Sequence, residues 1–270
     1  MEVLVSRTVK AVLEHLAGEL LEATESLVPV APLRDRFEGM TLADAYRVQT
    51  VQLENHLATG RVLAGRKVGL TSLAMQKQLG VDSPDFGFFF EDMVHHDEAR
   101  IPTAHFIQPK VEPEFCFVLK ESLQGPGVTV EQAAAAVGAI YPAIEIIDSR
   151  IRDWDIKLVD TIADNASCGA IAVSAQPLEL DPADPTGLLD VTCSLVIDGE
   201  VTGAGTGTDV MGNPVAALAW LANVLGEQGV ALEAGQLILP GSFTKAEPVT
   251  AGSTALADFG PLGKLTIHFI

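Results

Sequence analysis

The first 60 residues carry the hydrophobic pattern of helices. Apolar side chains recur at intervals of three and four positions over residues 9–20, which predicts an amphipathic helix. A second helix is expected from Thr41, because Thr41 and Asp44 have the spacing of a capping box. Gly60 is its expected end, since glycine readily adopts the left-handed conformation that closes helices. The pattern therefore predicts a small helical N-terminal segment over residues 1–60.

Beyond residue 60 the pattern changes to short apolar runs separated by glycine, proline and acidic residues. Such runs predict strands, which we expect at 66–70, 111–120, 140–148, 168–175, 190–198, 236–240 and 264–270. An alanine-rich helix is predicted over 130–137, and a longer one is predicted after the cap Asn213 and Pro214. Strands outnumber helices, so we predict an α+β protein with a mixed, curled β-sheet core over residues 61–270.

Three stretches have no clear alternation. Residues 71–79 are predicted as a short helix. Residues 80–93 mix Gly, Pro, Asp and Phe without a period, which predicts a long loop of the kind that often forms a functional lid. The glycine-rich run 203–208 lacks the third glycine of a dinucleotide-binding fingerprint, and we expect a turn or bulge there.

The chain is strongly acidic, with 17 Lys and Arg against 36 Asp and Glu and a net charge of −19. Nucleic-acid-binding faces and surfaces that dock on anionic membranes need clustered basic residues, so no nucleic-acid or membrane partner is expected. The three cysteines are widely spaced and form no paired motif, which predicts reduced thiols. We find no apolar signal core and no membrane-spanning run, so we expect a cytoplasmic protein.

The most informative segment is the strand predicted over 111–120, which contains Glu112 and Glu114. Because side chains alternate along a strand, both glutamates share one face. An isolated pair of this kind would also suit a solvated edge strand, but Glu145 lies between two isoleucines in the next predicted strand. Buried carboxylates need a partner, and neither strand interior offers a basic residue. Three carboxylates favour a hard cation, Mg²⁺ or Mn²⁺, with open positions for Lewis-acid chemistry.

This Glu-x-Glu pair followed by Glu145 resembles the metal triad of the fumarylacetoacetate hydrolase superfamily, and above all of its 2-keto-4-pentenoate (2-hydroxypenta-2,4-dienoate) hydratase members. The resemblance extends along nearly the whole chain. The segments that carry it are 31–35 (APLRD), 65–71 (GRKVGLT), 78–87 (QLGVDSPDFG), 149–154 (SRIRDW) and 159–169 (VDTIADNASCG).

The resemblance implies a hydro-lyase that requires a divalent metal. In these hydratases 2-hydroxypenta-2,4-dienoate is ketonised, and water then adds at C4 to give 4-hydroxy-2-oxopentanoate. A 2-oxo acid can chelate one metal through its carboxylate and keto oxygens, and both steps need negative charge to be stabilised at the oxygen on C2. The resemblance also implies a homo-oligomer, either a pentamer or a decamer.

Four further residues are candidates for the site. Lys67 lies in an apolar setting and is the expected second partner of the oxygen on C2, although a lysine there could also be a surface residue at a strand end. The resemblance gives Asp85, in the predicted lid, a role in proton transfer or in orienting water. It makes Ser167 a contact of the substrate carboxylate, and Ser242 is expected in a second wall of the pocket.

Several alternatives remain open at this point. The closest is a 4-oxalocrotonate decarboxylase, in whose subgroup the position of Asp85 tends to be apolar. A 2-oxohept-4-ene-1,7-dioate hydratase would need a cation for the distal carboxylate. The carbon–carbon hydrolases of the superfamily that the chain resembles typically carry a His and, a few residues later, a Glu that activate water. Residues 67–78, the corresponding stretch, contain neither, so the resemblance disfavours hydrolysis of a carbon–carbon bond. A binding module with a structural cation would explain the glutamates, but not Lys67 and Asp85.

Overall fold

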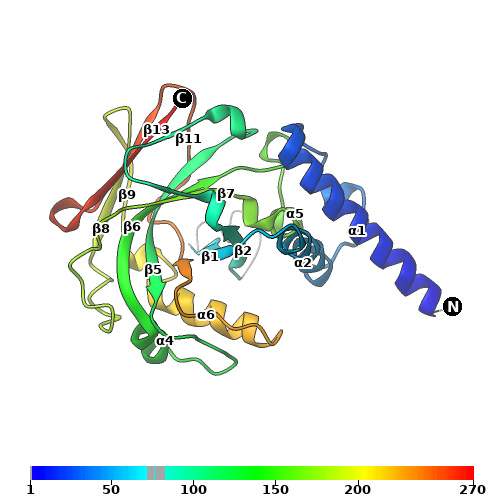
Figure 1. Ribbon diagram of the computed structural model, residues 1–270, viewed down its shortest axis with the longest axis horizontal. Coiled ribbons are helices and arrows are strands. Elements are labelled where there is room, and N and C mark those ends of the chain that lie inside the picture. The colour runs from blue at the N-terminus through cyan, green and yellow to red at the C-terminus, as the bar shows by residue number, and fades with distance from the viewer. Residues whose placement is uncertain (1, 72–75, 77–82) are drawn as a thin grey trace.

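The computed structural model describes residues 2–71, 76 and 83–270, and it has two sheets and a group of helices at one side (Figure 1). The helices are α1 (Glu2–Ser26), α2 (Leu42–Ala58), α4 (Val130–Ala136), α5 (Leu158–Ala163) and α6 (Pro214–Gly226). The prediction of an α+β protein with a mixed sheet core is confirmed. No helix of the described residues is both long and apolar enough to cross a membrane.

The larger sheet contains the strands that later form the site. Its order is β2 (Asp85–Phe90), β1 (Leu63–Gly69), β10 (Leu237–Leu239), β5 (Lys110–Leu119), β6 (Val137–Ile147), β7 (Cys168–Val173) and β3 (Val94–His96), with β11 (Glu247–Pro248) paired to β5. β1 and β10 run parallel, and β5 and β6 run antiparallel over their whole length. Figure 1 shows β5 and β6 as long, bent strands, so the sheet curls.

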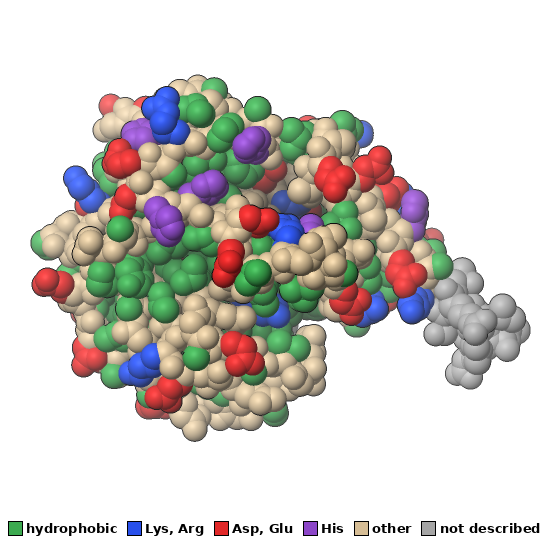
Figure 2. Space-filling view, in the orientation of Figure 1, with side chains coloured by type: hydrophobic (Ala, Val, Ile, Leu, Met, Phe, Trp, Pro, Cys, Tyr) green, Lys and Arg blue, Asp and Glu red, His purple; other side chains and the backbone are tan. Residues whose placement is uncertain are grey.

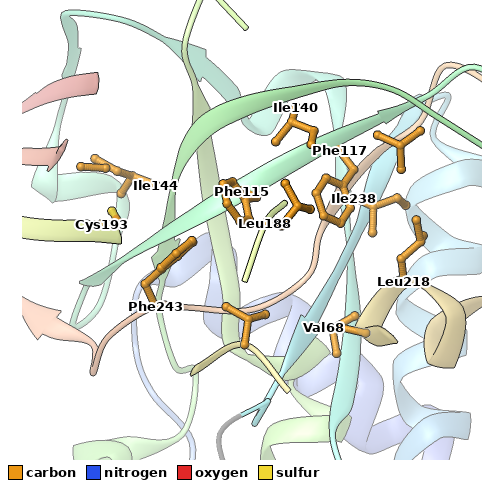
Figure 3. Packing of buried hydrophobic residues seen from close by; sticks show 14 of the residues in the cluster. Val68, Phe115, Phe117, Ile140, Ile144, Leu188, Cys193, Leu218, Ile238 and Phe243 are labelled. Carbon is orange, nitrogen blue, oxygen red and sulfur yellow. The ribbon is translucent and has the colours of Figure 1, made fainter. Parts of the chain in front are cut away.

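The smaller sheet has the order β4 (Ala99–Ile101), β13 (Lys264–Phe269), β12 (Thr254–Asp258), β8 (Thr192–Ile197) and β9 (Glu200–Thr206). One hydrophobic core joins both sheets and α6. Figure 3 shows Phe115 and Phe117 of β5 inside this core, with Val68 of β1 and Leu218 of α6 nearby. β5 is therefore buried on both faces, as the sequence predicts.

The helical predictions agree with the structure. The Asp44 N–H donates to Thr41 Oγ1 at 3.2 Å, and Asp44 Oδ2 accepts from the Thr41 N–H at 3.0 Å, so the capping box is present. Asn213 Oδ1 caps α6 through the Val215 N–H at 2.9 Å. A second core cluster packs α1 and α2 against α5, through Leu16, Val48 and Ile162 among others.

The prediction of a lid over residues 80–93 is wrong for the part that the structure describes. Residues 85–90, expected within a lid, form β2, which is buried along its whole length between neighbouring elements, and Glu91–Met93 form a 3-10 turn. A strand buried on both faces shows no alternation of polar and apolar residues, which explains the error. The short helix predicted over 71–79 lies almost entirely outside the described residues.

The turn or bulge predicted over 203–208 is partly right. Residues 203–206 belong to β9, which pairs with β8 and has a register shift between Val201 and Gly203, and a 3-10 turn begins at Gly207. Two positions of β9 require glycine, because another segment of the chain approaches their backbone closely. A Cβ at Gly205 would collide with the carbonyl oxygen of Phe243, and a Cβ at Gly203 would lie 2.9 Å from Cβ of Thr244. The segment after β10 therefore crosses directly over these glycines. The strands β3, β4, β11 and β12 were not predicted, and all are five residues or shorter.

We expect Gly205→Ala to destabilise the protein by about 1–3 kcal/mol, the usual cost of overpacking a fixed backbone contact. Gly18→Ala is the matched control, because a Cβ at Gly18 in α1 meets no atom within 4 Å and alanine favours a helix by up to about 1 kcal/mol. Urea unfolding of both variants measures the difference. A Gly205→Ala protein as stable as the parent would show that the Phe243 carbonyl does not constrain β9.

Candidate active site

The three glutamates meet on one face of the β5–β6 pair. Glu112 lies directly opposite Glu145 in the register, and Glu114 follows two positions along β5. One carboxylate oxygen of each residue lies within 4.8 Å of those of the other two. Antiparallel pairing with a side-chain period of two thus brings together the residues that the sequence singles out.

The cluster is poorly solvated. Glu114 is 1% exposed and Glu145 is fully buried. The Gly241 N–H donates to Glu114 Oε2 at 2.8 Å, whereas Glu114 Oε1 and Glu145 Oε2 have no hydrogen-bond partner among the described residues. Burial, together with the neighbouring carboxylates, raises the pKa of Glu114 well above its usual range and the pKa of Glu112 to about 7. Unsatisfied carboxylate oxygens in this arrangement are the donors that a hard divalent cation prefers.

Lys67 reaches the cluster from β1, two strands away from β5. Its Nζ lies 3.3 Å from Glu145 Oε1 and donates to the carbonyl oxygen of Ala166 at 3.0 Å. Burial alone would lower the pKa of Lys67, but the carboxylates of Glu145, Asp85 and Glu112 outweigh it and raise the pKa above its usual range. Lys67 is therefore a buried ammonium in the site, and the alternative of an exposed lysine at a strand end is wrong.

Asp85 is the first residue of β2 and lies opposite Gly69 of β1. It is 2% exposed, so it belongs to a buried strand rather than to a lid. A Cβ at Gly69 would collide with Asp85 Oδ1 and would lie 3.1 Å from Lys67 Nζ, so glycine lets both side chains face the same space. Burial raises the pKa of Asp85, while Lys67, the Gly69 N–H and the Thr161 hydroxyl oppose this rise.

Ser167 lies in a short turn with unusual backbone geometry. Asn165, Ala166 and Ser167 have φ angles of 56°, 49° and 54°, a left-handed conformation that costs free energy in non-glycine residues. The turn directs the Ala166 carbonyl to Lys67 and places Ser167 Oγ 3.4 Å from Thr161 Oγ1. No sequence pattern predicts this strain, which is characteristic of sites where surrounding contacts fix the backbone.

A cavity of about 380 Å³ lies beside the glutamate cluster and is reached by Glu112 of that cluster. Its lining includes Lys67, Asp85, Glu112, Ser167 and two residues that sequence reasoning missed, Lys110 and Trp154. The Lys110 ammonium lies 4.2 Å from the centre of the Trp154 ring. Lys110 shares the face of Glu112 and Glu114 two positions earlier on β5, a period-two signal that could have identified it.

Ser242 lies beside Glu114, in an isolated bridge to it. Its hydroxyl donates to the carbonyl oxygen of Pro113 at 3.3 Å and accepts from the Thr244 N–H at 3.2 Å. It is not among the described lining residues of the cavity, so a contact between Ser242 and substrate stays a prediction. Because Ser242 lies next to Glu114, the segment that contains Ser242 borders the glutamate cluster.

The chain matches the family model "Fumarylacetoacetate (FAA) hydrolase C-terminal" over residues 64–270. The chain belongs to the FAA hydrolase family. The match starts at β1 and includes every residue of the site described above.

Relatives within the FAA hydrolase family extend the similarity to the N-terminal helices. The chain is 40% identical over 262 residues to the 2-hydroxyhexa-2,4-dienoate hydratase of Comamonas testosteroni, covering 96% of this chain and 98% of that one. It is also 40% identical to the 2-keto-4-pentenoate hydratase of Paraburkholderia xenovorans (strain LB400), covering 95% of this chain and 94% of that one. The chain is also similar to a solved structure, 4-oxalocrotonate decarboxylase from Pseudomonas putida G7 complexed with magnesium and adipate. The TM-score is 0.91 at 32% identity, and the similarity covers 96% of this chain and 97% of that one.

We expect Glu114→Gln to stabilise the metal-free protein by about 1 kcal/mol or more, because a neutral side chain removes repulsion between buried carboxylates. The amide oxygen can still accept the Gly241 N–H. Thermal unfolding in excess chelator measures the effect, with the exposed Glu22→Gln as the control for loss of one charge. A lower melting temperature for Glu114→Gln would mean that the three carboxylates do not repel one another.

Proposed function

We propose that this protein is a divalent-metal-dependent hydratase that converts 2-hydroxypenta-2,4-dienoate, through 2-oxopent-3-enoate, to 4-hydroxy-2-oxopentanoate in the meta-cleavage degradation of aromatic compounds. The observation that carries the proposal is a cluster of three carboxylates, Glu112, Glu114 and Glu145, with a buried lysine paired to it. Lys67, Asp85 and Glu112 line one cavity beside this cluster. The hydratases among its relatives share more of its sequence than the decarboxylase does, which supports water addition over loss of CO₂. The homo-oligomer and the cytoplasmic location stay predictions.

Glu112, Glu114 and Glu145 would hold the cation, and the carboxylate oxygens without hydrogen-bond partners support this assignment. When bound, Mg²⁺ or Mn²⁺ supplies a Lewis acid for a 2-oxo acid. The Gly241 N–H fixes one oxygen of Glu114, so that its other oxygen faces the cluster. Strand pairing places the three residues on one face of β5 and β6, with one carboxylate oxygen of each within 4.8 Å of the other two.

Lys67 would stabilise negative charge on the substrate and would not bind the metal. Its ammonium is held by Glu145 and by the Ala166 carbonyl, so it is oriented before substrate arrives. A fixed cation in a poorly solvated site stabilises negative charge that develops on a substrate oxygen. The raised pKa of Lys67 keeps it protonated at neutral pH.

Asp85 would orient the water or move the proton. It lines the same cavity as Lys67 and Ser167, and Asp85 Oδ1 has no hydrogen-bond partner among the residues described. Burial raises the pKa of its carboxyl, the direction of change that proton-transfer carboxyls show in enzymes. A carboxylate at this position would oppose the binding of a second substrate carboxylate by repulsion, which favours the hydratase over the decarboxylase.

The decisive experiment is product identification. Purified protein is mixed with 2-hydroxypenta-2,4-dienoate and Mg²⁺ or Mn²⁺, loss of dienol absorbance is followed, and NMR identifies the product. 4-Hydroxy-2-oxopentanoate formed only with metal is the expected result. Release of CO₂ from 4-oxalocrotonate at a higher rate than hydration would establish the decarboxylase instead.

We expect Mg²⁺ affinity to fall by about tenfold between pH 8 and pH 6. Because the pKa of Glu112 is raised to about 7 in the metal-free site, a proton competes with the cation below that pH, and metal binding releases protons. Calorimetric titration in two buffers of different ionisation enthalpy measures both the affinity and the released protons. An affinity independent of pH would place the metal away from Glu112.

We expect Lys67→Ala to reduce kcat by about 10²–10³, the usual loss for one electrostatic partner of developing charge, while metal affinity changes little. Lys264→Ala, at an exposed position of β13, is the control for loss of one positive charge. Turnover and calorimetric metal binding are measured for both variants. Turnover within a few-fold of the parent would reduce Lys67 to a structural partner of Glu145.

A further inference from the structure

Helix α2 places two buried amides against the elements of the site. Gln49 is 3% exposed and Gln52 is 6% exposed. Gln49 Nε2 donates to two carbonyl oxygens from different elements, Phe86 in β2 at 2.8 Å and Ile162 in α5 at 3.0 Å. Gln52 Nε2 donates to the carbonyl oxygen of Ala163 at 2.7 Å. Both side chains therefore connect the N-terminal helices to the part of the chain that carries the cavity.

Two of the accepting carbonyls lie at the end of α5, where that of Ile162 also accepts a backbone N–H of the C-cap. Ile162 and Ala163 end α5, and the last carbonyls of a helix have no N–H donor one turn further on. Here the chain leaves the helix for the left-handed turn at residues 165–167, so the regular pattern cannot continue. The amides of Gln49 and Gln52 donate to these two carbonyls and so stabilise the point at which the turn begins.

Each acceptor of Gln49 is the carbonyl of a residue that directly follows a residue of the cavity. Phe86 follows Asp85, and Ile162 follows Thr161, whose hydroxyl favours the charged form of Asp85. One amide group thus links the strand that begins with Asp85 to the helix that carries Thr161. Tyr46, one turn earlier on α2, stacks on Phe86 with ring centres 4.5 Å apart, so α2 holds this point of β2 from two sides.

We propose that Gln49 is a positioning residue, which acts through Asp85 by holding β2 and α5 at the separation that hydration requires. Gln49 lies among apolar residues of α2 such as Val48, where an apolar side chain would fill the space without burying an amide. Burial of an amide costs free energy unless it is hydrogen-bonded. The inference rests on the proposed function, since it concerns the rate of that reaction.

The test compares Gln49→Met with Asn55→Leu. Methionine has nearly the shape of glutamine and no N–H donor. Asn55, on the same helix, donates only within α2, to the Val51 carbonyl at 2.8 Å. We expect Gln49→Met to lower kcat by about 10- to 100-fold, as small misplacements of reacting groups do, with metal affinity unchanged. Asn55→Leu should retain the parent kcat, even if it lowers the melting temperature as much as Gln49→Met does.

A double-mutant cycle with Asp85→Asn separates positioning from general damage. If Gln49 acts through Asp85, the two losses in kcat do not add, and Gln49→Met costs little in the Asp85→Asn background. Thr161→Val replaces Asp85→Asn where residual turnover is too low to measure. Equal losses in both backgrounds, or an unchanged kcat for Gln49→Met alone, would overturn the proposal. Failure of the proposed function would instead appear in the parent protein, as absence of 4-hydroxy-2-oxopentanoate.

Discussion

The structure of the site depends on the burial of three like charges side by side. Pairing of β5 with β6 places Glu112 opposite Glu145, with Glu114 two positions further on, and the surrounding core keeps bulk water away from most of the cluster. Lys67 compensates one of these charges, and carboxylate oxygens without partners remain. A chain selected only for stability would place neutral residues there, so the cluster indicates a binding role that offsets its cost.

This constraint explains the unusual backbone around the cluster. Lys67 and Asp85 can both reach the cavity because Gly69 between them has no side chain. The Ala166 carbonyl can meet Lys67 because residues 165–167 adopt a left-handed turn. Such a turn is held from outside: the buried carboxylate of Asp164 accepts from the backbone N–H and the guanidinium of Arg150 and from Ser167 Oγ at 3.3 Å. Strain in one short segment is thus offset by an ion pair behind it.

The sequence predicted those parts of the site that follow from local periodicity. Alternation along one strand puts Glu112 and Glu114 on the same face, and a lone Glu145 in an apolar run indicates a nearby charge partner. Lys67 as that partner could not be derived from local pattern, because long-range pairing sets the neighbours of β1. In the sheet, β10 lies between β1 and β5. The sequence pattern predicts a loop where β2 lies, because a strand buried on both faces has no alternation. This error misplaced Asp85 in a lid.

The boundary at residue 60 is a prediction from the change of hydrophobic pattern along the chain. Packing nevertheless joins the two sides. Leu16 and Val48 share a core cluster with Ile162, so the helices bury apolar area that belongs to α5 as much as to themselves. In addition, the Arg34 guanidinium pairs with the fully buried carboxylate of Asp160 at 2.5 Å. Since loss of one partner of a buried ion pair costs several kcal/mol (about 3–5), α5 and the turn that follows it depend on the helices. The N-terminal segment is therefore a part of the site's framework, although a sequence pattern divides it from the catalytic strands.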